Sequence, residues 1–180
     1  MCGVPSWFPA TDCLYRPLRP HYPRYIHAEG RIHGRKDTAQ LREEIARAYE
    51  EYLAELKDAG PHWERKPAAG GEGEEAWSAR QAAEHIASST TFFANGIARA
   101  VEVDAPAIQQ PAFASAETAV ASMPGIQQTL QSVLDQVTDA QLDMEREFGP
   151  LGKSTLERVV GICALHLNDH GNQLRTLRLG

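Results

Sequence analysis

Apolar residues recur at spacings of three and four in four separate stretches of the chain, which is the period of an amphipathic helix. The first stretch begins at the capping pair Asp37-Thr38 and stops at Gly60-Pro61, where glycine suits a helix C-terminus and proline cannot continue it. Its apolar positions are Leu41, Ile45, Ala48, Tyr49, Tyr52, Leu53 and Leu56. We therefore predict a first helix between these boundaries and a loop over 60–76.

The second stretch opens at Ser78, whose S-x-x-Q spacing to Gln81 satisfies two free backbone N–H groups at a helix start. Its inward positions are Ala82, His85, Ile86, Phe92, Phe93 and Ile97. Residues 101–114 contain Pro106 and Pro111 and are predicted to form a long connection. A connection of this length can cross the end of a bundle, so the second and third helices need not be antiparallel neighbours.

The third stretch runs from about Ser115 to Val137, and Pro124-Gly125 is expected to kink or restart this helix. Its apolar stripe comprises Val120, Met123, Ile126, Leu130, Val133, Leu134 and Val137. A turn around Thr138-Asp139 and a loop ending at Gly149-Pro150 follow it. We expect this third helix to pack through the stripe.

The fourth stretch starts at Ser154, which forms an S-x-x-E capping box with Glu157, and extends to about Arg178. Its stripe consists of Leu156, Val159, Ile162 or Cys163, His166, His170, Gln173 and Leu177. No strand is expected anywhere in the chain. The pattern therefore predicts an all-α protein, a four-helix bundle over 37–180 with a long crossover between helices two and three.

Residues 1–36 show no helical or strand period and contain five prolines. They hold six basic and two acidic side chains, or +4, which leaves 12 minus 22, or −10, for residues 37–180. We predict an irregular basic extension that is poorly ordered, although an arm that packs on a partner and an upstream stretch from a misassigned start are alternatives. The acidic remainder repels phosphate backbones, so nucleic acid is not an expected partner.

Three cysteines, widely spaced and without a CxxC pair, argue against a disulfide framework or a cysteine-based zinc site. No apolar run approaches the roughly 18 residues of a membrane-spanning helix, and the N-terminus lacks the apolar stretch of a secretory signal. These features predict a cytoplasmic protein without a membrane partner.

Three histidines occupy the inward stripes of the second and fourth helices. His166 and His170 lie four residues apart, so both imidazoles project from one helix face within reach of a single ion. His85 could supply a third ligand across the bundle. Three neutral imidazoles leave coordination positions open for water or substrate, as catalytic sites do. The alternative for each histidine is a core side chain that hydrogen-bonds to the backbone.

The whole pattern resembles the DinB-like superfamily of metal-binding helical bundles, and the resemblance covers residues 37–180. It is carried by Trp77-Ser78, Glu84-His85-Ile86, Leu151-Gly152-Lys153-Ser154-Thr155-Leu156, His166-Leu167-Asn168-Asp169-His170 and Gln173. In that family the corresponding three histidines bind zinc, nickel or a similar ion, which implies the same role for His85, His166 and His170. Relatives include transferases that use bacillithiol, mycothiol or glutathione, thiol-dependent isomerases and members classed as hydrolases.

Other side chains near the histidines have two interpretations each. Asp169 could orient a ligand or act as a base, or it could be simply solvated. Gln173 could hydrogen-bond a ligand or substrate, or lie at the edge of the core. Cys163 could ligate an ion or be redox-active, although a cysteine among apolar residues is more often a core side chain.

The segment Gly149-Pro150-Leu151-Gly152-Lys153-Ser154 is similar to part of a phosphate-binding loop. That motif also requires a glycine at 147, where Glu147 stands, and a preceding strand. We therefore exclude nucleotide binding and interpret Ser154 as a helix cap.

Two functions remain open. The first is a metal-dependent enzyme that activates a low-molecular-weight thiol or water to attack a small-molecule substrate, with one divalent ion, zinc preferred over nickel or iron. The second is a non-catalytic, metal-stabilised, stress-related bundle that acts as a homodimeric binding protein. Substrate contacts are expected from the loops over 60–76 and 101–114.

Overall fold

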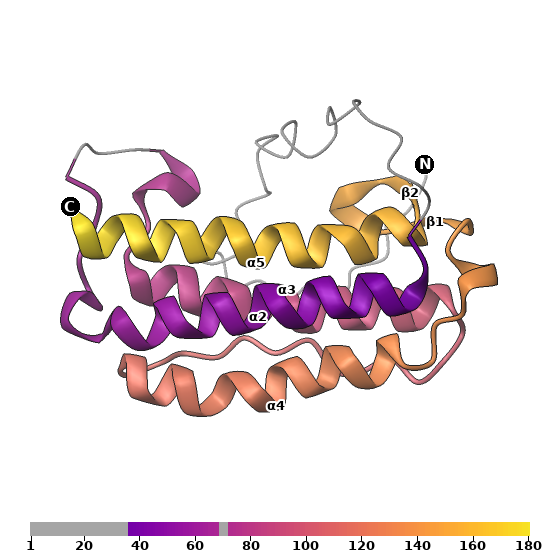
Figure 1. Cartoon of the computed structure of the whole chain (residues 1–180), viewed down its shortest axis with the longest axis horizontal. Helices are drawn as coiled ribbons and strands as arrows, with labels where there is room; N and C mark the ends of the chain where they lie inside the picture. The colour runs from indigo at the N-terminus through magenta and orange to yellow at the C-terminus, as the bar shows by residue number, and fades with distance from the viewer. Residues whose placement is uncertain (1–35, 69–71) are drawn as a thin grey trace, which may run out of the picture. The chain divides into compact units, whose positions relative to one another are not determined.

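Four long helices dominate the described part of the chain, residues 36–68 and 72–180, in this computed structural model (Figure 1). They are α2 (Thr38–Asp58), α3 (Ala79–Ala100), α4 (Ala116–Leu134) and α5 (Leu156–Leu179). The connections hold the 3-10 helices η1 (Gly60–His62), η2 (Gly73–Ala76), η3 (Asp139–Gln141) and η4 (Gly149–Leu151), and the strands β1 (Glu145–Glu147) and β2 (Lys153–Thr155). The predicted all-α bundle is confirmed. Of the extension predicted over 1–36, residues 1–35 lie outside the described residues.

None of the helices within these ranges combines the length and apolar character needed to cross a bilayer.

The capping residues predicted for the first two helices are in place. The Asp37 side chain accepts a hydrogen bond from the Gln40 N–H at 2.8 Å, and the Gln40 side chain accepts from the Asp37 N–H. Ser78 and Gln81 make the same reciprocal pair at the start of α3. Because each box satisfies two N–H groups that have no partner inside the helix, these boundaries follow from local sequence.

The third predicted helix is shorter than expected. α4 begins after Ser115, whose side chain accepts from the Thr118 N–H at 3.3 Å, and it passes Pro124 without a restart. It ends at Leu134, and the N–H groups of Gln136 and Val137 bond three residues back, to the Val133 and Leu134 carbonyls at 3.0 and 3.1 Å. Val137 is buried beyond the end of the helix and still belongs to the core.

The start of the fourth helix corrects two predictions. β1 and β2 form an antiparallel hairpin in which Ser154 pairs with Arg146, so the expectation of no strand was wrong. Gly149 and Gly152 allow the turn, because both have positive φ, 58° and 67°. Ser154 is therefore not the helix cap. Thr155 takes that role and accepts a hydrogen bond from the Arg158 N–H at 3.4 Å.

Backbone carbonyls of the segment before the hairpin complete the start of α5. The Leu156 N–H donates to the Met144 carbonyl at 3.0 Å, and the Glu157 N–H donates to the Leu142 carbonyl at 2.9 Å. These bonds satisfy N–H groups that the first helical turn leaves without intrahelical partners. The start of the helix is thereby joined to the segment that leads into β1.

The long crossover predicted between helices two and three is residues 101–115, which run back along α3 (Figure 1). Three hydrogen bonds mark its path: Asn95 Nδ2 to the Pro106 carbonyl at 2.7 Å, the Gln109 N–H to Thr91 Oγ1 at 2.9 Å, and the Phe113 N–H to Glu84 Oε1 at 3.0 Å. As the crossover advances, its partners on α3 step back toward the start of that helix. α3 and α4 therefore run parallel, as the predicted crossover permits.

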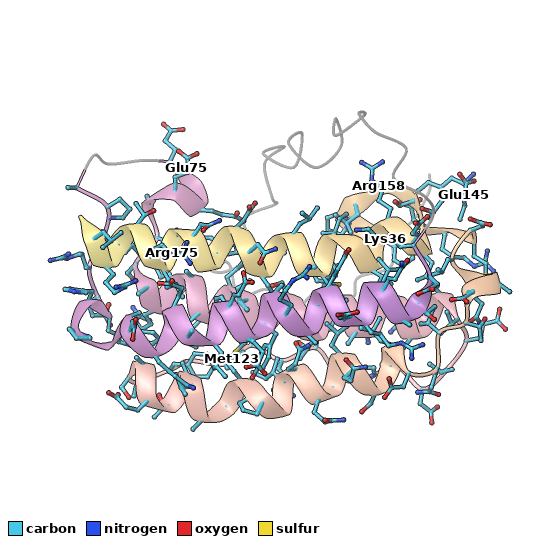
Figure 2. All side chains as sticks on the ribbon, in the orientation of Figure 1. Lys36, Glu75, Met123, Glu145, Arg158 and Arg175 are labelled. Atoms are coloured by element: carbon cyan, nitrogen blue, oxygen red, sulfur yellow. The ribbon has the colours of Figure 1, made fainter. Side chains whose placement is uncertain are left out.

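α2 and α5 also run parallel and pack side by side. At one end the Lys36 N–H donates to Glu157 Oε1 at 3.3 Å, and at the other Arg175 Nε contacts Glu55 Oε1 at 2.8 Å. The core between the four helices is a single apolar cluster. Met123, labelled in Figure 2, belongs to it and is 1% exposed.

Candidate metal centre

Three histidines from two helices meet between α3 and α5. His85 lies in the second turn of α3, while His166 and His170 lie one turn apart on α5. His166 and His170 are buried, 5% and 4% exposed, whereas the His85 side chain keeps 19% of its surface accessible. One potential ligand atom from each residue lies within 4.8 Å of the other two. The structure therefore brings together the three residues predicted as ligands.

The separations of the rings suit a shared ion. His85 Nε2 lies 3.0 Å from His166 Nε2, and the three ring centroids are 4.7 to 5.0 Å apart. Zinc–imidazole bonds of about 2.0–2.1 Å place two nitrogens of a tetrahedral site roughly 3.3 Å from each other. The His85 and His166 nitrogens are near this separation, and the potential ligand atoms of all three rings lie within 4.8 Å of one another.

Neighbouring side chains determine which nitrogen of each ring carries a proton. Gln173 Nε2 donates to the Glu74 carbonyl at 2.6 Å, so Gln173 Oε1 faces His170 Nδ1, at 2.7 Å. His170 Nδ1 must then hold the proton, which leaves Nε2 with its lone pair. Ser89 Oγ, which donates to the His85 carbonyl at 2.7 Å, lies 3.4 Å from His166 Nδ1 and can accept from it. Both α5 histidines thus direct an unprotonated Nε2 toward the cluster.

Burial keeps the imidazoles neutral. Desolvation, followed by the neighbouring His170, lowers the pKa of His85 to about 3. Desolvation also lowers the pKa of His170 to about 4, against the opposing effect of the hydrogen bond that His170 donates to Gln173 Oε1, and it lowers the pKa of His166 well below its usual value. Neutral imidazole is the form that binds metal ions, so the environment favours ligation at neutral pH.

Residues 40–174 match the DinB superfamily, which is more than half of the chain. The chain belongs to the DinB superfamily. This result confirms the resemblance drawn from the histidines and the capping motifs. No curated protein and no solved structure gives a significant match.

Two aromatic rings enclose the histidines of this DinB-superfamily chain. Trp77 stacks on His170 with ring centroids 6.1 Å apart and an interplanar angle of 11°, and its centroid lies 4.8 Å from that of His85. Phe93 approaches His166 edge-on at 5.8 Å. In the sequence, Trp77 is predicted only as part of the motif that carries the family resemblance. Its place directly before the Ser78 cap is a signal that it lies near His85. Phe93 and Ser89 lie on the His85 side of α3 at helical spacing, which is a weaker signal.

The other predicted residues have different surroundings. Gln173 contacts His170 directly, and its predicted role of hydrogen-bonding a ligand or substrate stays a prediction. Asp169 is exposed on α5, and its predicted role as a base or orienting group stays a prediction. Cys163 is buried, its Sγ lies 3.5 Å from the Val159 carbonyl, and burial raises its pKa to about 12. A protonated thiol in the core is neither a ready nucleophile nor a ready ligand.

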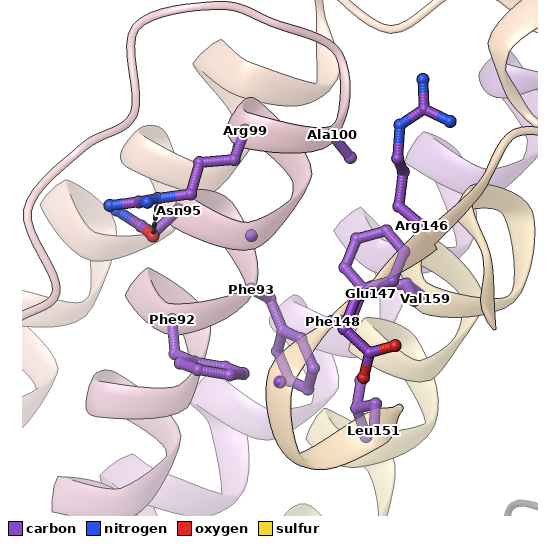
Figure 3. Close-up of a pocket in the computed structure, with 12 residues that line it drawn as sticks. Phe92, Phe93, Asn95, Arg99, Ala100, Arg146, Glu147, Phe148, Leu151 and Val159 are labelled. Atoms are coloured by element: carbon purple, nitrogen blue, oxygen red, sulfur yellow. Dashed lines mark hydrogen bonds between the residues drawn. The ribbon is translucent and has the colours of Figure 1, made fainter. Parts of the chain in front are cut away.

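A separate pocket of about 490 Å³ opens between α3, the hairpin and the first turns of α5 (Figure 3). Phe92, Phe93, Phe148 and Leu151 supply its apolar lining, and Arg99 and Arg146 lie at its edge. Phe93 belongs to both this pocket and the surroundings of His166. The helical pattern of the sequence does not predict this pocket. The pocket depends on the hairpin, which that pattern does not reveal.

Proposed function

We propose that this chain binds one divalent metal ion through His85, His166 and His170, and that the bound ion activates a low-molecular-weight thiol or water. The observation that carries the proposal is the convergence of three neutral imidazoles, two of which have their Nδ1 hydrogens engaged by Ser89 and Gln173. The Nε2 atoms of these two rings keep lone pairs that a cation can accept, and His85 Nε2, 3.0 Å from His166 Nε2, becomes a ligand atom when the His85 proton lies on Nδ1. Zinc is the preferred ion, and nickel or iron also suits imidazole ligands.

A divalent ion held by three imidazoles retains open positions and lowers the pKa of a thiol or water that occupies one of them. The residues of this chain supply the rest. Gln173 and Ser89 orient two rings, and Trp77 and Phe93 exclude bulk water from their faces. The accessible edge of His85 leaves a path by which a small molecule reaches the cluster. Thiol transfer to an electrophilic small molecule is the chemistry that we propose first.

Elemental analysis of the native protein beside a His166→Ala/His170→Ala variant tests metal binding. We expect about one divalent ion per chain in the native protein and none in the variant, because a single imidazole does not hold an ion tightly. His62→Ala is the matched control, since His62 lies on η1 outside the cluster. An equal metal content in the native protein and the double variant would refute the proposal, provided that circular dichroism shows both to be helical.

A second candidate, a non-catalytic bundle in which the ion joins α3 to α5, is favoured by the nearly complete burial of His166 and His170. Metal removal separates the two functions. If the metal-loaded protein consumes no electrophile with bacillithiol, mycothiol or glutathione, and the melting temperature falls steeply on chelation, the structural role is supported. Thiol-dependent turnover that disappears on chelation while the fold persists supports the enzyme.

A further inference from the structure

The short helix η2 lies directly beside the histidine cluster and is held there at two points. Gln173 Nε2 donates to the Glu74 carbonyl at 2.6 Å, while its Oε1 contacts His170. Trp77, which ends η2, packs against His85 and His170. One amide side chain and one indole ring therefore couple the position of Glu74 to that of two predicted ligands.

The Glu74 side chain reaches the cluster from this position. Its Oε1 lies 3.9 Å from His85 Nε2. The same His85 nitrogen lies 3.0 Å from His166 Nε2. At 3.9 Å the two atoms are too far apart for a hydrogen bond, so the contact brings two potential ligand atoms near each other. A carboxylate oxygen thus lies beside the imidazole nitrogens, and ligands of these two kinds together suit a shared cation.

We propose that Glu74 is the fourth protein ligand of this centre and binds through Oε1, so that a thiol or water enters as a fifth ligand. The inference rests on the proposed metal binding by the three histidines. Ligand atoms that share one ion lie roughly 3.3 Å apart, whereas Oε1 lies 3.9 Å from His85 Nε2, so the Glu74 side chain has to turn toward the histidines to bind. The carboxylate also supplies the one negative charge of the donor set, which strengthens the attraction for a dication.

The neighbouring Glu75 provides a matched control. It belongs to the same η2 turn and carries the same charge, but it is exposed and points away from the bundle (Figure 2). Glu74→Ala and Glu75→Ala change the net charge equally and lie outside the four long helices. Any difference between them in ion binding therefore reports direct contact rather than the overall field.

The experiment measures the Zn²⁺ affinity by competition with a coloured chelator and the visible absorption spectrum of the Co²⁺-loaded protein. We expect Glu74→Ala to weaken Zn²⁺ binding by roughly 10- to 100-fold and to shift the Co²⁺ bands. Glu74→Gln, which keeps the size and an uncharged oxygen donor, should fall between that variant and the native protein. Glu75→Ala should match the native protein, since exposed charges are screened by salt.

The outcomes distinguish this inference from the proposed function. If Glu74→Ala keeps the native affinity and Co²⁺ spectrum, Glu74 is not a ligand, while the three-histidine site stands. A weaker affinity with an unchanged Co²⁺ spectrum, or an equal loss in Glu75→Ala, would also overturn the ligand role and leave only electrostatic attraction. Failure of the native protein to bind Zn²⁺ or Co²⁺ at all overturns both proposals.

Discussion

The buried face of α4 and the buried seam between α3 and α5 belong to one core but differ in chemistry. The α4 face is apolar throughout and consists of Ala116, Ala119, Met123, Ile126, Leu130, Val133 and Leu134. Tyrosine and tryptophan aside, the buried residues with polar side chains in the described ranges lie on α3, on its cap or on α5, namely Ser78, Thr90, Thr91, His166 and His170. α4 therefore contributes apolar packing, whereas the seam between α3 and α5 contains the candidate metal ligands.

The seam also shows that buried polarity alone does not mark a site. Thr90 Oγ1 donates to the Ile86 carbonyl at 2.7 Å, and Thr91 Oγ1 donates to the Ser88 carbonyl at 2.9 Å. Backbone groups of their own helix satisfy these hydroxyls, so they require no ligand. His166 and His170 instead share with His85 a group of potential ligand atoms that all lie within 4.8 Å of one another. The convergence of three imidazoles, rather than burial, distinguishes the candidate centre.

The largest expected effect separates stability from metal binding. Leu130→Ala on the α4 face should lower the free energy of unfolding by about 2–5 kcal/mol, because Leu130 is 1% exposed and its loss leaves a cavity. The Zn²⁺ affinity of the folded variant should stay at the native value. Leu165→Ala is the control, since Leu165 on α5 is 48% exposed and should cost less than about 0.5 kcal/mol. A parallel loss of affinity in Leu130→Ala would show that scaffold and site are not separable.

The next effect is a pH dependence of the free energy of unfolding, which arises from the seam between α3 and α5 and not from the α4 face. Unfolded histidine titrates near pH 6.5, whereas the folded pKa of His170 is about 4, so the unfolded chain binds an extra proton between these values. The free energy of unfolding of the chelator-treated protein should therefore fall as the pH decreases from 6.5 to 4, by roughly 3 kcal/mol from His170 alone. Urea denaturation across this range measures it.

Two variants test whether this pH dependence of the free energy of unfolding comes from His170. His170→Ala should give a shallower decline, and Leu130→Ala should keep the native slope, because the buried α4 face has no titratable group. Identical slopes in the native protein and His170→Ala would contradict a neutral, buried His170.

A smaller effect is expected at the edge of the seam. Gln173→Ala removes both the acceptor for His170 Nδ1 and the donor to the Glu74 carbonyl, and it should weaken Zn²⁺ binding by roughly 10- to 100-fold through lost positioning. Asn172→Ala, at an exposed neighbouring position, should leave the affinity unchanged. Chelator competition on the two variants decides whether Gln173 is a positioning residue or only a core-edge side chain.

The smallest effect tests the start of α5. Thr155→Ala should cost about 1 kcal/mol of stability, because it removes the acceptor for the Arg158 N–H. Ser154→Ala should cost less than about 0.5 kcal/mol, since Ser154 lies in β2 and does not cap the helix. The reverse order in thermal or urea denaturation would restore Ser154 as the cap.

Much of the fold was predictable because its signals are local. Helical spacing of apolar residues and the reciprocal pairs at Asp37 and Ser78 involve positions at most four residues apart. The i, i+4 pair on α5 was predictable for the same reason. His85 required the family resemblance, since nothing local joins α3 to α5.

The errors lie where tertiary contacts decide between local alternatives. Ser154 and Thr155 both offer a hydroxyl, and the pairing of Ser154 with Arg146 in the hairpin selects Thr155 as the cap. Strands of three residues are too short to show a period. Glu74 lies in a loop without an apolar pattern, and its place depends on a hydrogen bond from Gln173, 99 residues later.

The carbonyls of Met144 and Leu142 that complete the first turn of α5 also set the rotational phase of that helix. Each residue turns an α-helix by about 100° and advances it by about 1.5 Å. His166 follows Leu156 by ten residues, or about 15 Å along the axis, so its direction around the axis depends on where these carbonyls hold the helix start. A single-residue deletion between Leu156 and His166 would turn both imidazoles by about 100°, away from α3. The segment over 142–144 thus sets the direction in which the α5 histidines point.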